Sequence, residues 1–192
     1  LIPYLRKAGE IKTKPTQHSV RTLLSMGIQP DILVCRSEVP IDQSVKRKIA
    51  LYCNVNEEAV IENLDVDTVY ELPLRFEAEG FANVVCRKLK IAEGIEPDLK
   101  DWTKLVDQFH SAGKSLEIAI VGKYVTLHDA YLSVTESLRH AAIPAGVRLN
   151  LRYVSAEEIE EKGPGALLEN TDAIVLPGGF GPRGMEGMVL TA

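Results

Sequence analysis

Short apolar runs alternate with amphipathic stretches along the first half of the chain. Residues 32–35 and 59–61 are continuous runs of this kind, which predict short strands buried on both faces of a parallel sheet. Apolar residues at helical spacing predict helices at residues 17–26, 44–52 and 73–89, the last interrupted at Gly80. Thr16 or Ser19 is expected to cap the first helix. This order predicts part of a doubly wound α/β domain over residues 1–90.

A change of composition at residues 91–101 divides the chain. Glycine, proline and acidic residues occur there without periodicity, so we assign residues 91–115 to an interdomain linker. A second alternation follows, with strands predicted from residue 117, at 147–154 and at 172–176, and a helix at 129–142. Asp129 is expected near the N-cap of that helix, and the Ser155 to Glu158 pattern predicts a capping box for the next. Residues 116–192 therefore predict a second doubly wound sheet.

Composition and charge narrow the class of protein. The chain has 192 residues, of which 45% are hydrophobic and 26% are charged, as in globular proteins. The net charge of −5 and the lack of a long basic run argue against binding to nucleic acid. Binding of a small anionic ligand needs only a local cluster of cations, so it is compatible with a negative net charge.

The cysteines, the histidines and the chain ends bear on the compartment of the protein and on possible metal sites. Cys35, Cys53 and Cys86 are odd in number and lack C-x-x-C spacing, which favours a reducing, cytoplasmic compartment over a disulfide framework. The four histidines are scattered, so no metal site is predicted. No stretch approaches the roughly 20 apolar residues of a membrane helix, and no leader pattern opens the chain. Both ends interrupt core-like sequence, and we interpret them as cuts.

Cations gather in two segments of the first half. The run K-T-K-P-T-Q-H-S at residues 12–19 places two lysines and several hydroxyls where a helix opens. Lysine side chains and the free N–H groups of a helix N-terminus both bind phosphate, although a solvated, well-capped helix start would look the same. Lys46, Arg47 and Lys48 fan out over the second helix, where a solvated face is the alternative.

Two segments of the second half follow buried strands. Residues 177–181, P-G-G-F-G, place bare N–H groups at the carboxyl edge of the sheet, where open α/β folds bind ligands. Such groups either stabilise an oxyanion in acyl transfer or form a tight turn. The G-K-Y run at residues 122–124 and the polar stretch 129–133 lie at the same edge, with a loop and a capped helix as the alternative. The glycine spacing G-G-x-G differs from the usual dinucleotide-binding pattern.

Taken together and in order, these segments resemble the CTP synthase family. The resemblance rests on G-E-I-K-T-K-P-T-Q-H-S-V at residues 9–20, Q-P-D-I-L-V-C-R at 29–36 and K-I-A-L-Y-C at 48–53. It continues with V-G-K-Y at 121–124 and P-G-G-F-G at 177–181, so it spans nearly the whole chain and is weakest in the linker. The K-T-K-P-T-Q-H-S run is highly specific to this family.

The resemblance implies a two-domain enzyme. In this family an N-terminal, P-loop-like amidoligase domain uses ATP and Mg²⁺ to phosphorylate O4 of UTP, and ammonia then displaces the phosphate to give CTP. A C-terminal, flavodoxin-like class I glutaminase domain releases that ammonia from glutamine, with GTP as allosteric activator. Residues 1–90 would be the end of the first domain and residues 116–192 the start of the second, both with incomplete sheets. The family is homotetrameric, which the resemblance extends to this protein.

The resemblance also implies roles for individual residues. The UTP and CTP phosphates are expected at Lys12, Thr13, Lys14, Pro15, Thr16, Gln17 and Lys48. The adenine of ATP is expected at Leu64, Asp65 and Val66, and the oxyanion formed from glutamine at the N–H of Gly179. The GTP activator is expected at Lys123, Tyr124, Phe180 and Arg183.

Other parts of the family's machinery have no counterpart in this stretch. The family's phosphate-binding loop and magnesium carboxylates would lie upstream of Leu1, and the glutaminase cysteine, histidine and glutamate downstream of Ala192. The stretch alone is therefore expected to be inactive. Two rival interpretations are a non-catalytic interaction protein and a stand-alone class I glutaminase that uses only residue 116 onward. The second leaves the cations of residues 12–48 unexplained.

Overall fold

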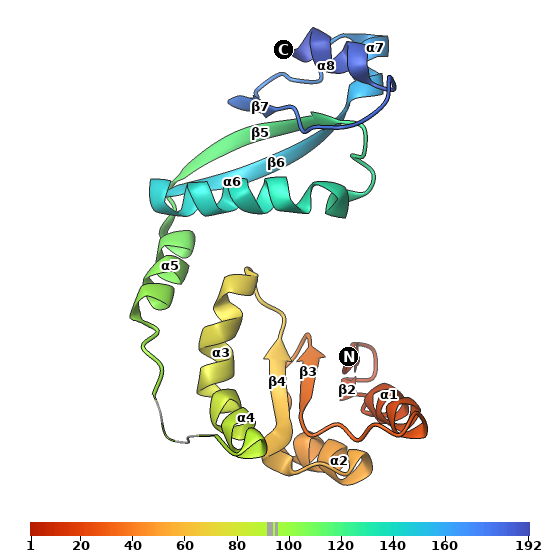
Figure 1. Cartoon of the computed structure of the whole chain (residues 1–192), viewed down its shortest axis with the longest axis vertical. Coiled ribbons are helices and arrows are strands. Elements are labelled where there is room, and N and C mark those ends of the chain that lie inside the picture. The colour runs from red at the N-terminus through yellow and green to blue at the C-terminus, as the bar shows by residue number, and fades with distance from the viewer. Residues whose placement is uncertain (92–93, 95) are drawn as a thin grey trace. The chain divides into compact units, whose positions relative to one another are not determined.

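The computed structural model describes residues 1–91, 94 and 96–192 (Figure 1). It divides into two compact units, Leu1–Trp102 (unit 1) and Thr103–Ala192 (unit 2). Residues 92, 93 and 95 of the predicted linker lie outside the described residues. In the described part of the chain, none of the helices combines the length and the apolarity needed to cross a membrane.

Unit 1 is built on two parallel strands. β3 (Leu33–Ser37) pairs with β4 (Val60–Leu64), so that Ser37 lies opposite Leu64 at their carboxyl ends. A small antiparallel hairpin, β1 (Tyr4–Leu5) and β2 (Glu10–Ile11), precedes this pair. The helices are α1 (Lys14–Ser25), α2 (Gln43–Cys53), α3 (Leu72–Ala78) and α4 (Phe81–Leu89), with 3-10 turns at Glu57–Ala59 and Val69–Glu71. Gly80, with φ of 72°, separates α3 from α4 at the predicted interruption.

The core of unit 1 forms between the two strands and the helices α1 and α2. Its buried members are Ile2, Val20, Cys35, Ile41, Ile49, Ala50, Cys53 and Val60. Removing this apolar surface from water is the main force that holds the helices on the strands. Burial also raises the pKa of the Cys35 thiol to about 11, so the thiol stays neutral near pH 7. Cys35 is therefore a structural core residue, not a nucleophile.

Unit 2 contains three parallel strands in the order β6-β5-β7 (Figure 1). The central strand β5 (Lys114–Gly122) pairs along its length with β6 (Val147–Ser155) and over Ile118–Ile120 with β7 (Ala173–Val175). The helices are α5 (Lys100–Ser111), which begins in unit 1, α6 (Leu132–Ala145), α7 (Ala156–Lys162) and α8 (Met185–Thr191), with a 3-10 turn at His128–Tyr131 before α6. The predicted α/β class with doubly wound, mostly parallel sheets is confirmed.

The predicted cap of the first helix is wrong. Helix α1 begins at Lys14, and Pro15 occupies its first turn, where the missing N–H of proline costs no hydrogen bond. Thr16 and Ser19 therefore lie inside the helix. Their hydroxyls donate to the carbonyls of Leu1 and Pro15, both at 3.1 Å, instead of accepting from the helix end.

In unit 2 one helix starts later than predicted, and another starts at the predicted residue but lacks the predicted capping bonds. Helix α6 begins at Leu132, without a side-chain cap at Tyr131, so Asp129 is not its N-cap. Tyr131 is buried at the end of the 3-10 turn before α6, and its hydroxyl accepts from the loop after β5. Helix α7 follows Ser155, but the Ser155 hydroxyl donates to the Glu157 carboxylate at 3.2 Å and makes no cap bond. The predicted capping box is therefore absent from this described helix.

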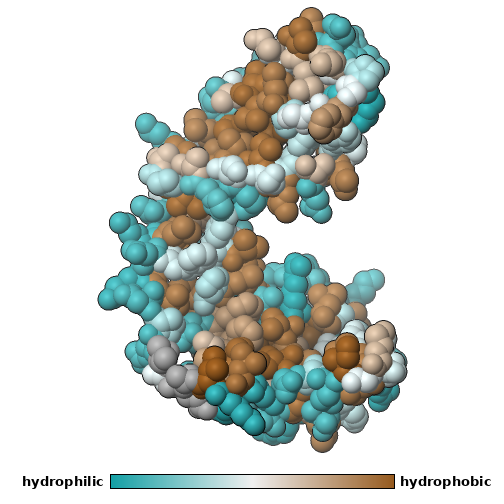
Figure 2. Space-filling model, in the orientation of Figure 1, coloured by the Kyte–Doolittle hydropathy of each residue, from teal (hydrophilic) through white to brown (hydrophobic). Residues whose placement is uncertain are grey.

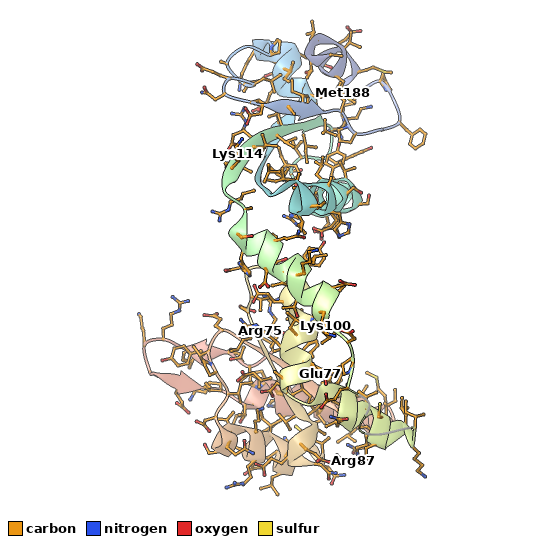
Figure 3. The ribbon with its side chains drawn as sticks, turned by 90° about the vertical axis from the view of Figure 1, so that its left-hand side faces the viewer. Arg75, Glu77, Arg87, Lys100, Lys114 and Met188 are labelled. Atoms are coloured by element: carbon orange, nitrogen blue, oxygen red, sulfur yellow. The ribbon has the colours of Figure 1, made fainter. Side chains whose placement is uncertain are left out.

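The close packing of α7 against α8 depends on one glycine. A Cβ at Gly187 would lie 1.8 Å from the carbonyl oxygen of Ala156, a backbone atom that cannot move without moving α7. Met188, the next residue of α8 (Figure 3), packs on the core formed by Ala119, Val121, Val154, Ala156 and Ile159. A methyl group at position 187 would therefore push α8 off this core.

We expect Gly187→Ala to lower the free energy of unfolding of unit 2 by about 1–3 kcal/mol, the usual range for overpacking. Urea unfolding of the chain measures this as a lower midpoint. Gly165→Ala is the matched control, because a Cβ there meets no atom within 4 Å. Equal midpoints for the two variants would contradict the close approach of the helices.

Candidate functional site

The first candidate segment, residues 12–17, is anchored to the end of β3 by the N-terminal hairpin. The N–H of Ile2 donates to the carbonyl of Arg36 at 2.8 Å, and the N–H of Lys12 donates to the carbonyl of Pro3 at 2.9 Å. The Thr16 hydroxyl closes the arrangement by its bond to the carbonyl of Leu1. The segment therefore lies beside the carboxyl end of β3.

Within this segment the lysines and the hydroxyls have different environments. Thr13, Thr16 and Gln17 are buried, and the Gln17 amide donates to the Thr13 hydroxyl at 3.1 Å. Lys14 and Pro15 are exposed, and Lys12 is half-buried. The buried residues fix the backbone of the turn, and the Lys14 side chain remains exposed to solvent.

Helix α2 adds a further lysine to this region. Lys46 pairs with Glu79 at 2.5 Å and Arg47 with Glu57 at 3.5 Å, whereas Lys48 makes no ion pair with any described residue. The pKa of the Glu10 carboxyl is lowered chiefly by the hydrogen bond from Lys12, at 2.5 Å, and also by the charge of Lys48. Both lysines thus act on one carboxylate. The charge of Lys48 reaches this carboxylate although Lys48 lies 36 positions after Lys12 in the sequence.

The residues expected at adenine lie where β4 ends. Leu64 is the last residue of β4, and the N–H of Asp65 donates to the carbonyl of Ser37 at 3.0 Å. The Asp65 carboxylate accepts from the guanidinium of Arg36 at 2.7 Å. Leu64, Asp65 and Val66 therefore continue the carboxyl edge of the β3–β4 pair, the edge at which open α/β sheets bind ligands.

In unit 2 the candidate residues come from loops at the carboxyl ends of the strands. Lys123 and Tyr124 follow β5, and the 177–181 loop and Arg183 follow β7. The buried Lys123 ammonium donates to the carbonyls of Phe180 at 3.2 Å and Gly181 at 2.6 Å. The structure therefore brings the two predicted loops into contact.

Arg183 and aromatic rings form the outer part of this region. The Arg183 guanidinium donates to the Glu157 carboxylate at 2.8 Å and to the Lys123 carbonyl at 3.2 Å, and lies 5.5 Å from the centre of the Tyr124 ring. The Phe180 side chain is 97% exposed. Hydrophobic residues at the surface of each unit are visible in Figure 2.

The N–H of Gly179 has no hydrogen-bond partner among the described residues, and Gly179 is exposed. A Cβ at Gly179 would meet Lys123 atoms at 3.6–3.8 Å, which are ordinary contacts. Packing inside this chain therefore does not require a glycine at position 179. A ligand that approaches the backbone closely would supply such a requirement.

Sequence analysis included Gly122 and Tyr131 in candidate segments but gave neither residue a role. A Cβ at Gly122 would lie 2.3 Å from the Tyr131 hydroxyl, so only glycine leaves room for it. That hydroxyl accepts the N–H groups of Lys123 at 2.9 Å and Tyr124 at 3.1 Å. The sequence placed the G-K-Y run and the 129–133 stretch at the same edge, but no pattern in a single sequence shows that the Tyr131 hydroxyl accepts from the amides of the loop.

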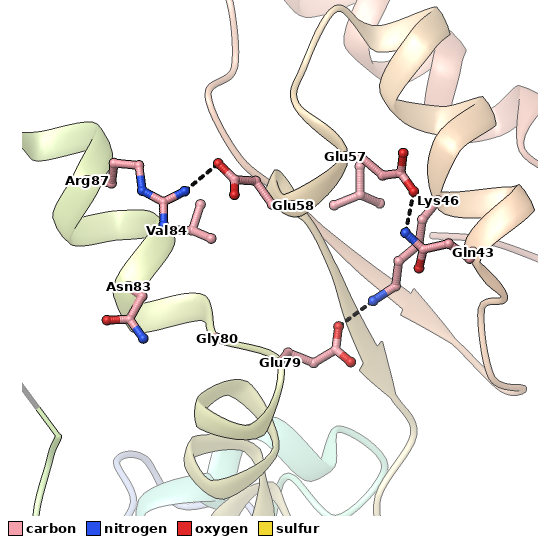
Figure 4. A pocket seen from close by; sticks show the side chains of 10 residues that line it. Gln43, Lys46, Glu57, Glu58, Glu79, Gly80, Asn83, Val84 and Arg87 are labelled. Atoms are coloured by element: carbon pink, nitrogen blue, oxygen red, sulfur yellow. Dashed lines mark hydrogen bonds and ion pairs between the residues drawn. The ribbon is translucent and has the colours of Figure 1, made fainter. Parts of the chain in front are cut away.

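Each unit also has a hollow lined by polar residues. In unit 1 a pocket of about 450 Å³ lies near the amino end of β4, and Lys46–Glu79, Arg87–Glu58 and Gln43–Glu57 interact across or beside it (Figure 4). Its charges are therefore largely paired with one another. A pocket of about 320 Å³ in unit 2 lies between α6 and β6, lined by Asp129, Leu132, Thr135, Arg139, Leu149, Leu151 and Tyr153.

Neither unit, taken by itself, offers a metal centre among its described residues. Within each unit no three histidine, cysteine or carboxylate side chains come into metal-binding range of one another. No set of metal ligands is therefore assigned within either unit.

Both units have relatives among known proteins. Residues 1–91 match the family described as CTP synthase N-terminus, and residues 126–192 match glutamine amidotransferase class-I. The chain is 52% identical to a CTP synthase from Synechococcus sp. (strain JA-3-3Ab), over 100% of this chain and 35% of that relative. CTP synthases from Ruminiclostridium cellulolyticum and Prochlorococcus marinus (strain NATL1A) are 51% and 53% identical, over 98% of this chain and 35% and 34% of their own lengths.

The chain belongs to the CTP synthase family. It spans about a third of the length of these curated relatives. The CTP synthase N-terminus match contains residues 12–17, Lys48 and residues 64–66, and the amidotransferase match contains Gly179, Phe180 and Arg183. Lys123 and Tyr124 lie just before the second match and belong to the region that only the full-length CTP synthase relatives cover.

We expect the loop amides of unit 2 to differ in hydrogen exchange. The amides of Lys123 and Tyr124 should exchange slowly because they donate to a buried hydroxyl, whereas the free, exposed amide of Gly179 should exchange fast. Hydrogen exchange followed by NMR measures this, with the buried strand amide of Ile120 as the slow reference. Exchange of Lys123 and Tyr124 as fast as that of Gly179 would rule out the Tyr131 anchor.

Proposed function

We propose that the full-length protein that carries this chain makes CTP from UTP, using ATP and ammonia released from glutamine. The observation that carries this proposal is the 51–53% identity to proteins named CTP synthase over the whole chain, across both units. We assign residues 1–90 to the amidoligase domain, 91–115 to the linker and 116–192 to the glutaminase domain. We further propose a cytoplasmic homotetramer, and that this stretch alone is inactive.

We infer that the triphosphate of UTP or CTP binds at the cations beside the end of β3. Lys12 bonds to Glu10, the charge of Lys48 also acts on Glu10, and Lys14 is exposed at the start of α1, so a triphosphate can meet several positive charges and the helix N-terminus. The buried Thr13, Thr16 and Gln17 hold the turn, with Pro15 in the first helical turn. Binding would require Lys12 to exchange its bond with Glu10 for one with phosphate.

We infer that ATP lies with its adenine along residues 64–66, at the same carboxyl edge of unit 1. When bound, ATP with Mg²⁺ supplies the phosphoryl group for UTP. The residues of this chain orient the base, while we expect the magnesium ligands outside it. The Arg36–Asp65 pair would hold this edge in place.

In unit 2 we infer that the N–H of Gly179 receives the oxyanion formed from glutamine. Oriented backbone donors of this kind stabilise developing charge without reorganisation. We place the activator GTP against Tyr124, Phe180 and Arg183, which offer aromatic surface and a guanidinium. Lys123 holds the loop that carries Phe180, since its ammonium donates to the carbonyls of Phe180 and Gly181.

Lys12→Ala or Lys48→Ala should weaken the binding of UTP and CTP by about ten- to a hundredfold, because each removes a charged hydrogen bond to phosphate. Glu10→Gln should have the opposite effect, about two- to fivefold tighter binding, because it frees Lys12 from an exposed ion pair. Isothermal titration of the full-length protein with CTP measures all three.

Arg47→Ala is the matched control, because this neighbouring cation on α2 faces Glu57. Its CTP affinity, and the ATP affinity of every variant, should stay close to that of the unmodified protein. If both lysine variants bind CTP normally, the assignment of the triphosphate site is incorrect.

Gly179→Pro should abolish most glutamine hydrolysis, because proline has no N–H to donate. The loss of one oxyanion donor typically costs about a hundred- to a thousandfold in kcat. CTP formation from added ammonia bypasses the glutaminase and should persist in the same variant. Loss of both activities in a folded protein, or retention of glutamine hydrolysis, would contradict the oxyanion role.

A further inference from the structure

The Tyr131 hydroxyl is a buried acceptor for a loop that carries candidate site residues. Tyr131 is only 4% exposed, and its oxygen receives the N–H groups of Lys123 at 2.9 Å and Tyr124 at 3.1 Å. Two consecutive backbone donors that converge on one oxygen fix the direction in which the chain leaves β5. Gly122 makes this possible, because any side chain there would occupy the position of the hydroxyl.

Lys123 links the fixed loop after β5 to the loop after β7. Its side chain crosses to that loop, where the ammonium donates to the carbonyls of Phe180 at 3.2 Å and Gly181 at 2.6 Å. Burying an ammonium is costly unless its hydrogen bonds are satisfied, so the two carbonyls are held toward it. Arg183 adds a second tie by donating to the Lys123 carbonyl at 3.2 Å.

Gly179 lies between two fixed points of its loop. Pro177 is buried on one side, and the carbonyls bound by Lys123 lie one and two residues further along. The aliphatic part of Lys123 lies directly behind Gly179, with Cε 3.6 Å from the place of a Cβ. The backbone of Gly179 is therefore supported from behind, while its N–H remains without a partner among the described residues.

We propose that Tyr131 and Lys123 act in series as positioning residues for the N–H of Gly179. Tyr131 fixes Lys123, and Lys123 fixes the 177–181 loop, so that the donor is in place before charge develops on the substrate. This inference rests on the proposed glutaminase role of unit 2. It gives Lys123 a role that requires no direct contact with a nucleotide.

The test uses the full-length protein with Lys123→Met and Tyr131→Phe. Lys123→Met keeps the aliphatic stem and removes the donors, and Tyr131→Phe removes only the acceptor oxygen. We expect each to lower kcat for glutamine hydrolysis by about ten- to a hundredfold, since misplacing a catalytic group by about 1 Å has effects of this size. KM for glutamine and CTP formation from ammonia should change little, because the interaction is made in the transition state.

Matched controls separate this effect from a general loss of charge or hydroxyl. Lys162→Met removes an exposed lysine of α7 whose partner Glu158 is 3.5 Å away, and Tyr52→Phe removes an exposed hydroxyl in unit 1. Both should retain normal glutamine hydrolysis. Lys123→Arg should recover part of the activity lost in Lys123→Met, because it restores donors to the two carbonyls.

A second readout is independent of activity. The amides of Lys123 and Tyr124 should exchange faster in Tyr131→Phe, and the backbone NMR chemical shifts of residues 178–181 should change in both variants, while the amides of β5 between Ile118 and Val121 stay protected. Unchanged chemical shifts at 178–181 and unchanged kcat in both variants would overturn the proposal, as would full recovery of Lys123→Met at saturating GTP, which indicates a direct nucleotide contact. An unmodified protein that hydrolyses glutamine but forms no CTP would instead contradict the proposed overall reaction alone.

Discussion

Parallel strand pairing is the constraint on which the rest of the structure depends. In each unit the paired strands end at a common edge, with Ser37 opposite Leu64 in unit 1 and Gly122 opposite Ser155 in unit 2. The segments that follow these strands must then emerge side by side, whatever their distance in the sequence. Residues with no local relation, such as Lys123 and Phe180, meet for this reason. The hydrogen bonding of each sheet therefore brings the candidate residues of that unit to one edge.

Burial divides the lysines of this chain into two kinds. Lys14 and Lys48 are exposed, and Lys12 is half-buried in a pair with Glu10, so their charge is available to an incoming anion. Lys123 is buried, and its ammonium is bound to loop carbonyls, so its charge organises the protein itself. An ammonium that is already desolvated and bonded gains little from a phosphate, whereas a solvated one gains a charged hydrogen bond. The burial of each lysine thus decides whether its charge is available to a ligand or is used within the protein.

The glycines of unit 2 separate in the same way. Gly122 and Gly187 are required by the chain itself, because a Cβ at either would collide with Tyr131 or with the backbone of Ala156. Gly179 meets no such obstacle, and its N–H is free among the described residues. The contrast supports a packing role for the first two and a ligand-directed role for the third. It also explains why a glycine motif alone does not distinguish a turn from an oxyanion site.

The sequence by itself determined the α/β class, the parallel sheets, the break at Gly80 and the family, because hydrophobic periodicity and contiguous motifs are local properties of the chain. Tertiary structure decided where α1 and α6 begin, because the hydroxyls of Thr16 and Tyr131 bind partners outside their own helix ends. It also decided that Lys12 bonds to Glu10, and that Tyr131 anchors the loop of Lys123. A polar side chain takes whichever partner the fold brings within reach, and that choice is not encoded in its neighbours along the chain.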